Sequence, residues 1–264
     1  MRKSLCCLAL GAALIPFVGR IAGAEDVKPV AVPSLSWIIA TRPVPGTLAI
    51  EPPRTVHASA PYYCSPCLFY GGDINPSAPN VNGFANENTL LVADTTLFVP
   101  FTVPAGQGWE ISGLFTNNLA DGYEGIDPMQ AAWSISTGMS AGHPGTVIAS
   151  GTATATFTPT GRSAFGLNEY TVNVVLTRPG ARLVPGTYWL SVVPQCTDSS
   201  NGGCDIAQYF VANTQGLNHY GPEEPVGKSF FNSAYYGYSY GDACWLDPTG
   251  CGRFSAGVEG VIVH

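Results

Sequence analysis

From Leu90 to the C-terminus, apolar and polar residues alternate with a period of two, and this pattern constrains the fold more than any other feature of the chain. In residues 151–158, Ala153, Ala155 and Phe157 alternate with four threonines. Successive side chains of a strand point to opposite faces, so the alternation predicts strands with one face in water. It predicts eight or nine strands, in residues 97–103, 109–115, 131–135, 151–158, 170–176, 188–192, 206–211 and 254–263.

Turn signals and composition indicate how these strands are connected. Pro- and Gly-containing turns separate the expected strands at residues 104–106, 144–145, 159–161, 179–180 and 185–186. With 11% charged residues, 31 Gly and 22 Pro, the chain is short of helix formers. No helical period of about ten residues or more lies between two expected strands. Parallel βαβ folds need such crossover helices, so an antiparallel sandwich or barrel remains.

A single sheet would leave one apolar face in water, which makes two sheets packed about 10 Å apart the simplest arrangement. We therefore predict an all-β fold, an antiparallel two-sheet sandwich that is jelly-roll-like and has disulfide-stapled loops. It forms a single domain over residues 61–264. Residues 25–60 precede it as a Pro-rich segment or linker, in which the apolar patch Leu35–Ile39 could add an edge strand.

The first 24 residues have the pattern of a secretory signal peptide. Met1–Lys3 carries positive charge, Leu5–Val18 is almost unbroken apolar sequence, and Ala22–Ala24 supplies the small residues of a cleavage site. The apolar run is short for a bilayer span and is followed at once by Glu25 and Asp26, which favours cleavage over anchoring. We expect a secreted, extracellular protein without a membrane span, with the periplasm as the other compartment that export allows.

Removal of Arg2, Lys3 and Arg20 with this peptide leaves 8 of the 11 basic residues against 18 acidic ones. Such an acidic protein repels nucleic acid phosphates and anionic lipid headgroups, so both are poor partners. Calcium or a neutral polymer fits this charge better, and we expect an extracellular polysaccharide or a cell-surface component as the partner.

Six cysteines remain after the signal peptide, in three local pairs: Cys64 and Cys67, Cys196 and Cys204, Cys244 and Cys251. In an oxidising compartment an even set normally forms disulfides, although six cysteines allow fifteen pairings. We predict nearest-neighbour bonds that staple loops. The CxxC spacing of the first pair also occurs in redox and zinc motifs, but no strand-then-helix context surrounds it and no second CxxC completes a zinc site.

Three carboxylates, Asp121, Glu124 and Asp127, lie in a Gly-containing segment. Calcium takes oxygen ligands from flexible loops, so these residues form a candidate calcium site. The spacing matches no EF-hand, and a solvated acidic loop between strands is the simpler interpretation. A bound ion would brace the loop and not perform chemistry.

Residues 237–241 spell GxSxG, the nucleophile elbow of α/β hydrolases, with Ser239 at its centre. The elbow requires a helix directly after the serine, and residues 242–248 do not provide one. His264 is the sole downstream histidine, and 23 residues leave no room for the strands that carry the acid and the base. A serine hydrolase is therefore disfavoured.

Aromatic residues are concentrated in one Gly-containing segment, as Tyr235, Tyr236, Tyr238, Tyr240 and Trp245. Flat rings on a rigid loop suit sugar faces, because their apolar bodies pack against C–H surfaces while polar edges form hydrogen bonds. The rings could equally cover a sheet edge or fill the space beneath a long loop. These five residues are the candidate ligand-binding site.

Several segments resemble a broad group of secreted bacterial β-sandwich proteins that includes anchor-choice domains. They are residues 92–94, 101–106, 109–112, 142–145, 147–151, 183–190 and 254–260. These segments mark strand starts and turns, so the resemblance implies fold and export and provides no catalytic residue. The chain ends at His264 without a hydrophobic, basic-tailed sorting segment, which favours free secretion over surface anchoring.

Together these features predict a non-catalytic secreted β-sandwich protein with a binding or structural role, and carbohydrate is the first ligand class to test. The alternative is a secreted hydrolase that acts on polysaccharide or ester substrates. A third option is a matrix component that assembles through exposed sheet edges.

Overall fold

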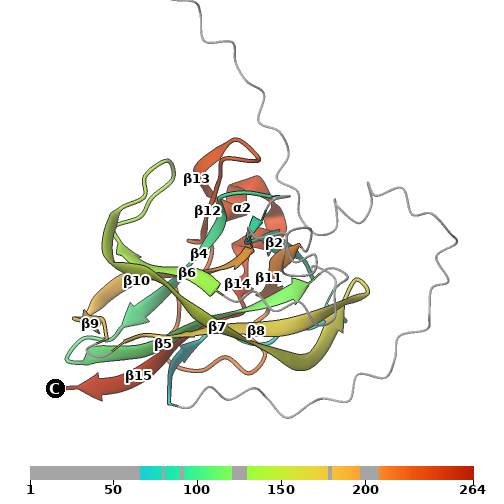
Figure 1. Ribbon diagram of the computed structural model, residues 1–264. Coiled ribbons are helices and arrows are strands. Elements are labelled where there is room, and N and C mark those ends of the chain that lie inside the picture. The colour runs from blue at the N-terminus through green and yellow to red at the C-terminus, as the bar shows by residue number, and fades with distance from the viewer. Residues whose placement is uncertain (1–65, 79–80, 90–91, 121–129, 178–179, 197–207) are drawn as a thin grey trace, which may run out of the picture.

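The computed structural model describes residues 66–78, 81–89, 92–120, 130–177, 180–196 and 208–264. Fifteen strands in these ranges belong to one hydrogen-bonded sheet (Figure 1). They are β1 Cys67–Tyr70, β2 Gly83–Ala85, β3 Asn88–Thr89, β4 Thr95–Val103, β5 Gly108–Ala120, β6 Gln130–Thr137, β7 Thr146–Ala164, β8 Leu167–Val175, β9 Arg182–Leu183, β10 Gly186–Cys196, β11 Tyr209–Thr214, β12 Phe230–Ser233, β13 Tyr238–Asp242, β14 Arg253–Phe254 and β15 Ala256–Val263. The described helical segments are α2 Ala243–Leu246 and the 3₁₀ turn η2 Pro248–Cys251. The all-β prediction is confirmed.

The sheet has the strand order β1-β15-β5-β8-β7-β6-β10-β4-β12-β13, with β2, β3, β9, β11 and β14 paired off this path. Among the described strands only β3 and β10 pair in parallel, and the other pairings are antiparallel. The antiparallel prediction is therefore confirmed. The strands form one continuous sheet that curls over on itself (Figure 1), and the finer prediction of a jelly-roll-like sandwich of two sheets is not confirmed.

The long strand β7 connects two parts of this curled sheet. Residues 146–154 pair with β6, and the following residues pair with β8. The four threonines between residues 151 and 158 are exposed, while Ala153, Ala155 and Phe157 are partly buried, as the alternation predicts. One strand thus keeps the same face exposed to solvent across both parts of the sheet.

The turn predicted at residues 159–161 is wrong, because β7 continues through it to Ala164. The pairing with β8 shifts register between Pro159 and Ser163, and Gly161 has a φ of 78°. A bulge of this kind accommodates a proline, which cannot donate a ladder hydrogen bond. The Pro-Thr-Gly signal therefore marks an irregular strand segment and not a strand end.

The apolar core includes the inward faces of β4, β5, β8 and β10. All four residues predicted to share one face of β4 are buried: Leu97, Val99, Phe101 and Val103. The Phe101 ring stacks on Trp109 and on Tyr188, with centroids 6.0 and 5.7 Å apart. Such large buried rings contribute much of the apolar area that stabilises a small domain.

The β12–β13 hairpin and β2 were not predicted, because their strands have only three to five residues and give too short a pattern. None of the helical segments in the described ranges has the length and hydrophobicity that a bilayer crossing requires. The N-terminal 65 residues, which hold the expected signal peptide and Pro-rich segment, lie outside the described part of the chain.

Candidate functional site

The aromatic-rich segment forms one corner of the molecule, drawn in orange and red at the top of Figure 1. Strand β12 pairs with β4, and β13 pairs with β12 and ends the strand order of the sheet. Gly237, with a φ of 75°, allows the turn of this hairpin. Helix α2 follows directly after β13, so the hairpin and the two helical segments form a continuous structure that we call the aromatic corner, residues 230–251.

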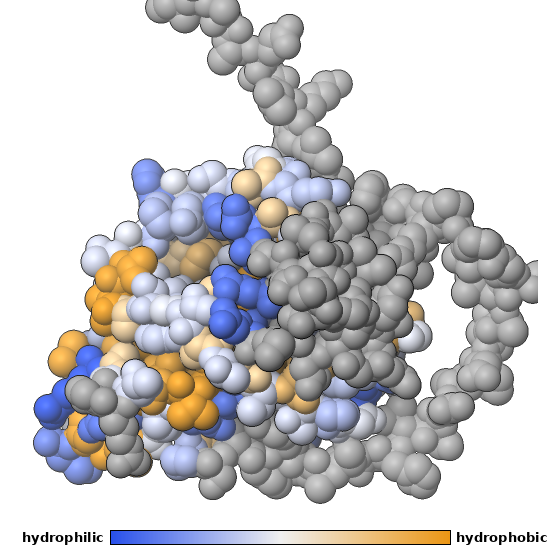
Figure 2. Space-filling model, in the orientation of Figure 1, coloured by the Kyte–Doolittle hydropathy of each residue, from blue (hydrophilic) through white to orange (hydrophobic). Residues whose placement is uncertain are grey.

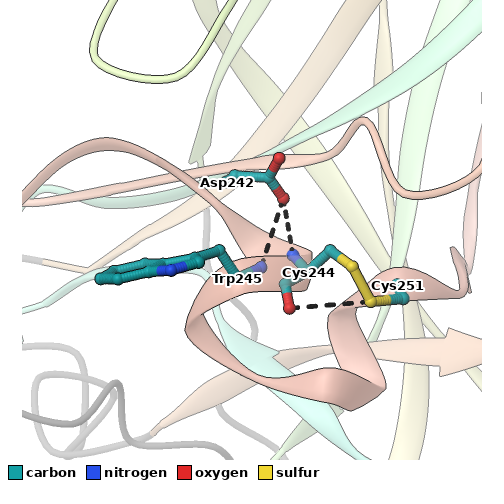
Figure 3. Close-up of a disulfide and its surroundings, with 4 residues drawn as sticks. All are labelled: Asp242, Cys244, Trp245 and Cys251. Carbon is teal, nitrogen blue, oxygen red and sulfur yellow. Dashed lines mark hydrogen bonds between the residues drawn. A yellow bond between two sulfur atoms is a disulfide. The ribbon is translucent and has the colours of Figure 1, made fainter.

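Asp242 and a disulfide fix the helical part of the aromatic corner (Figure 3). Oδ1 of Asp242 accepts hydrogen bonds from the backbone N–H groups of Cys244 at 2.9 Å and Trp245 at 3.4 Å. Aspartate is a favoured N-cap because it satisfies N–H groups that have no partner within the helix. The Cys244–Cys251 disulfide then joins α2 to η2. Trp245 therefore stands on a short turn that is held at its start and tied to the next turn.

The predicted Cys244–Cys251 bond is thus confirmed. Cys67 is disulfide-bonded as well, while Cys64, the partner expected for it, lies outside the described residues. Cys204 also lies outside them, so its bond to Cys196 stays a prediction.

The five candidate ligand-binding aromatic residues differ in exposure. Trp245 is 73% exposed and Tyr235 is 57% exposed. Tyr236 and Tyr238 are partly buried and pack near the Phe231 ring, with centroid distances of 6.3 and 6.2 Å. Tyr235 meets Tyr236 edge to face at 4.7 Å, so a packed ring supports an exposed one. The aromatic corner thus presents two rings to solvent, and one of them, Tyr235, rests on a partly buried ring.

Tyr240 contacts a different part of the molecule from Tyr238. Residues two apart in a regular strand share a face, but Tyr240 has a φ of 49°, in the left-handed region. Its ring lies 5.7 Å from that of Phe98, in a small cluster separate from the main core. The structure therefore does not bring the five aromatic residues together as a single surface.

Burial changes the acidity of two of these tyrosines. The pKa of Tyr236 is raised by burial and by the charge of Glu87, and the pKa of Tyr238 is raised by burial. Both hydroxyls therefore stay protonated at neutral pH and keep their ability to donate a hydrogen bond.

Ser239 is exposed in the middle of β13, an antiparallel strand. In a nucleophile elbow the serine itself sits in a strained strand-to-helix turn. Here the residue with positive φ is Tyr240. The expectation that residues 242–248 provide no helix is wrong, because α2 forms at Ala243–Leu246, but this single turn begins only four residues after Ser239. The GxSxG match therefore does not build an elbow at Ser239.

The candidate calcium ligands Asp121, Glu124 and Asp127 lie outside the described residues. In the ranges that the structure describes, no three His, Cys, Asp or Glu side chains are grouped closely enough to hold a metal ion.

Exposed apolar residues also occur away from the aromatic corner. Figure 2 shows hydrophobic residues in separate patches along the left and lower part of the visible face, with hydrophilic residues between them. Val147, Val175, Val184 and Val261 are each more than half exposed and lie on or next to different strands. Scattered apolar residues of this kind are normal on soluble proteins. Trp245 differs from them because its side chain is larger and, at 73%, more exposed.

A surface pocket of about 300 Å³ lies beside the aromatic corner. It is lined by the end of β11 and the next residue (residues 213–215), by Val226, by Pro248 of η2, and by Gly252 and Arg253. Strands β11 and β14 pair here, with Thr214 opposite Arg253. The pocket shares η2 with the disulfide that braces Trp245.

Two carboxylates face Arg253 at the edge of this pocket. Its guanidinium pairs with Glu223, and Nε lies 3.1 Å from Oε1 of Glu224, although this second contact lacks hydrogen-bond alignment. Burial raises the pKa of Glu224 to about 8, although the charge of Arg253 acts in the opposite direction. His219 lies edge-on to Phe69, and burial together with Arg253 lowers its pKa. Sequence alternation could not reveal the grouping of these charged residues around Arg253, because they come from loops and from the two-residue strand β14.

A second polar cluster, centred on Arg162, is buried beneath β7 and β8. Nη1 of Arg162 lies 2.9 Å from Oδ1 of Asp73, and Nε lies 2.5 Å from Oε2 of Glu169. The Tyr70 hydroxyl donates to Asp73 at 2.5 Å, and Thr160 donates to Glu169 at 2.8 Å. Burial raises the pKa of Glu169 and of Tyr70. All three charged side chains are at most 7% exposed, so this cluster is an interior support and not a ligand site.

Asn117 extends the Arg162 cluster into β5. Its Nδ2 donates to the Tyr70 hydroxyl at 3.0 Å and to Oγ of Ser255 at 2.8 Å. Its Oδ1 accepts from the Thr171 hydroxyl at 2.7 Å. Four strands, β1, β5, β7 and β8, are therefore joined by side-chain hydrogen bonds as well as by the sheet ladder.

No protein-family model matches this chain, and no curated protein and no solved structure matches it either. The resemblance to secreted bacterial β-sandwich proteins stays a prediction. The chemistry of the chain's own residues is therefore what supports a function.

Proposed function

We propose that this protein is a secreted, non-catalytic β-sheet protein that binds extracellular carbohydrate through the exposed rings of the aromatic corner. The first 24 residues direct export and are then cleaved, and the curled sheet serves as a jelly-roll-like scaffold. The observation that carries the proposal is Trp245, which is 73% exposed on a turn held by an aspartate cap and a disulfide.

An exposed tryptophan forgoes the roughly 1.5–3 kcal/mol that burial of a large apolar side chain contributes. A flexible loop would let such a ring fold back onto the surface, whereas the cap and the disulfide fix the backbone that carries Trp245 (Figure 3). A ring on an ordered backbone loses less conformational entropy on contact with a ligand than one on a flexible loop. A flat ring with an apolar face suits the C–H face of a sugar.

The charge balance supports a neutral polymer. The processed chain would hold 18 acidic residues and 8 of the 11 basic ones. Polyanions such as nucleic acids are therefore repelled, and uncharged glycans carry no such penalty.

Retention of the purified protein on a panel of insoluble polysaccharides tests this proposal. We expect saturable retention on at least one neutral polysaccharide, weakened about tenfold or more by Trp245→Ala, a loss of about 1.4 kcal/mol. Val175→Ala on β8 is the matched control, since Val175 is 68% exposed and should leave retention unchanged. Absence of retention across the panel, or equal retention by the Trp245 variant, would overturn the proposal.

Export is tested separately by N-terminal sequencing of protein secreted by its native host. The expected first residue is Glu25. An intact N-terminus in the cell fraction would contradict this part of the proposal and would leave the binding test unaffected.

A further inference from the structure

The pocket beside η2 offers a second surface for a ligand. Its volume of about 300 Å³ is at the small end of the roughly 300–1,000 Å³ range of ligand sites, so it suits a single ring. Its lining combines the apolar Val226 and Pro248 with the polar Gln215 and Arg253. Such a mixture of apolar walls and a few polar groups is typical of sites for small polar molecules.

The charges around the pocket argue for an uncharged ligand. Arg253 is already paired with Glu223, so an anionic ligand would have to displace that carboxylate. A cation would meet Arg253 itself at the pocket wall. A hydroxyl-rich neutral ligand avoids both penalties, because it can exchange hydrogen bonds without disturbing this pair.

The pocket and Trp245 belong to one braced structure. Pro248, which lines the pocket, begins η2, and the Cys244–Cys251 bond ties η2 to the helix that carries Trp245. Two contact points fixed relative to each other suit successive units of a chain better than a lone ring.

We propose that the pocket formed by residues 213–215, Val226, Pro248, Gly252 and Arg253 binds one neutral sugar ring, next to a ring of the same chain that packs on Trp245. This inference rests on the carbohydrate-binding function proposed above and defines a second subsite for it. It also predicts that single neutral sugars bind the pocket without Trp245.

Isotope-edited NMR of the whole secreted protein tests the pocket directly. Glucose, galactose, mannose, xylose and N-acetylglucosamine serve as neutral probes, and glucuronic acid serves as the charged one. We expect at least one neutral sugar to shift the backbone amide signals of Gly252 and Val226 saturably. Glucuronic acid should bind at least tenfold more weakly. No shift with any neutral sugar, or tighter binding of glucuronic acid, would overturn the inference.

Variants assign this binding to the pocket. Val226→Trp, at a residue that is 54% exposed, should fill the pocket and weaken the sugar response at least tenfold. Val184→Trp is the matched control: Val184 is 66% exposed and follows β9, which pairs with the opposite end of β5 from β11. Gln215→Ala should weaken the response several-fold, and it keeps the test decisive if the larger Val226 variant fails to fold.

The results separate the inference from the function on which it rests. Polysaccharide retention that is lost in Trp245→Ala but unchanged in Val226→Trp would overturn the pocket subsite and leave the proposed function intact. A sugar response that is lost in Val226→Trp, in a protein that no polysaccharide retains, would support the pocket and overturn the proposed polysaccharide-binding function.

Discussion

The Arg162 cluster and the aromatic corner both contain side chains whose burial is unusual for their type, in opposite directions. In the first, three charged side chains are buried, and in the second a tryptophan is 73% exposed. Buried charges are tolerated only when partners compensate their lost hydration, and Arg162 is paired with two carboxylates. An exposed ring needs no partner for stability, and the cap and the disulfide fix only the backbone that carries Trp245. Changes in the cluster should therefore affect folding, and changes at the corner should affect binding.

The largest expected effect is that of Arg162→Met. It leaves Asp73 and Glu169 buried without their counter-charge, so the free energy of unfolding should fall by about 3–5 kcal/mol. Chemical denaturation at pH 7, followed by circular dichroism, measures the loss. Trp245→Ala is the comparison variant and should change stability by less than about 0.5 kcal/mol. A loss below about 1 kcal/mol for the arginine variant would remove the distinction between the two regions.

The double variant Arg162→Met with Glu169→Leu sharpens this result. Removal of one uncompensated carboxylate should restore part of the lost stability, because an apolar replacement carries no desolvation cost. If the double variant is less stable than the single one by the full cost of another buried substitution, the cluster acts through packing and not through charge.

Sequence position explains why two features of the aromatic corner were predictable and the Arg162 cluster was not. The aromatic residues and the Cys244–Cys251 pair are neighbours in sequence, although the β12–β13 hairpin and helix α2 that carry them were not predicted. In the Arg162 cluster, by contrast, Tyr70 and Ser255 meet across 185 residues. Alternation places Glu169 on the polar face of β8, and only the fold covers that face with Asp73 and Tyr70. A period-two pattern identifies faces of strands, but it does not show what covers them.

The same limit applies inside the aromatic corner. Local spacing predicted the Cys244–Cys251 bond, which the structure confirms. The alternation rule would place Tyr238 and Tyr240 on one face, whereas the left-handed backbone at Tyr240 directs the two rings to different clusters. Positive φ at a non-glycine residue depends on surrounding contacts and has no reliable sequence signal.

Loss of the disulfide should have a smaller effect on stability than Arg162→Met. Replacement of both Cys244 and Cys251 by Ser opens a loop with a sequence separation of 7, which should cost about 2–3 kcal/mol of unfolding free energy. Trp245 should also lose its order, so the heteronuclear NOE of its indole N–H, resolved by NMR from those of the other four tryptophans, should decrease in the folded protein. A destabilised variant with an unchanged NOE would show that the disulfide does not position the ring.

Glu224 should make stability depend on pH. Its folded-state pKa of about 8 lies above the ordinary value of 4.5, so the folded protein holds the proton more tightly than the unfolded chain does. The resulting stabilisation is complete below pH 4.5 and is lost as the pH rises to about 8. Relative to Glu224→Gln, the wild type should lose up to about 1.4 kcal/mol per pH unit across this window.

Thermal or chemical unfolding of both proteins from pH 4 to 9 measures this difference. His219 has a lowered pKa and affects stability with the opposite sign at acidic pH. Both proteins retain His219, Glu223 and Arg253. Subtraction of the two stability curves therefore isolates the contribution of Glu224 to the pH dependence of unfolding. Parallel curves would show that Glu224 is ionised in the folded protein and that Arg253 compensates it fully.

The smallest expected effect is that of Asp242→Ala, which removes the N-cap of α2. Loss of a capping side chain typically costs about 1 kcal/mol, and here it frees the N–H groups of Cys244 and Trp245. Asp242→Asn is the control, since asparagine caps almost as well and retains the acceptor oxygen. We expect polysaccharide retention to weaken in the alanine variant and to persist in the asparagine variant. Equal retention by both would mean that the disulfide alone holds Trp245 outward and that the cap contributes only to folding.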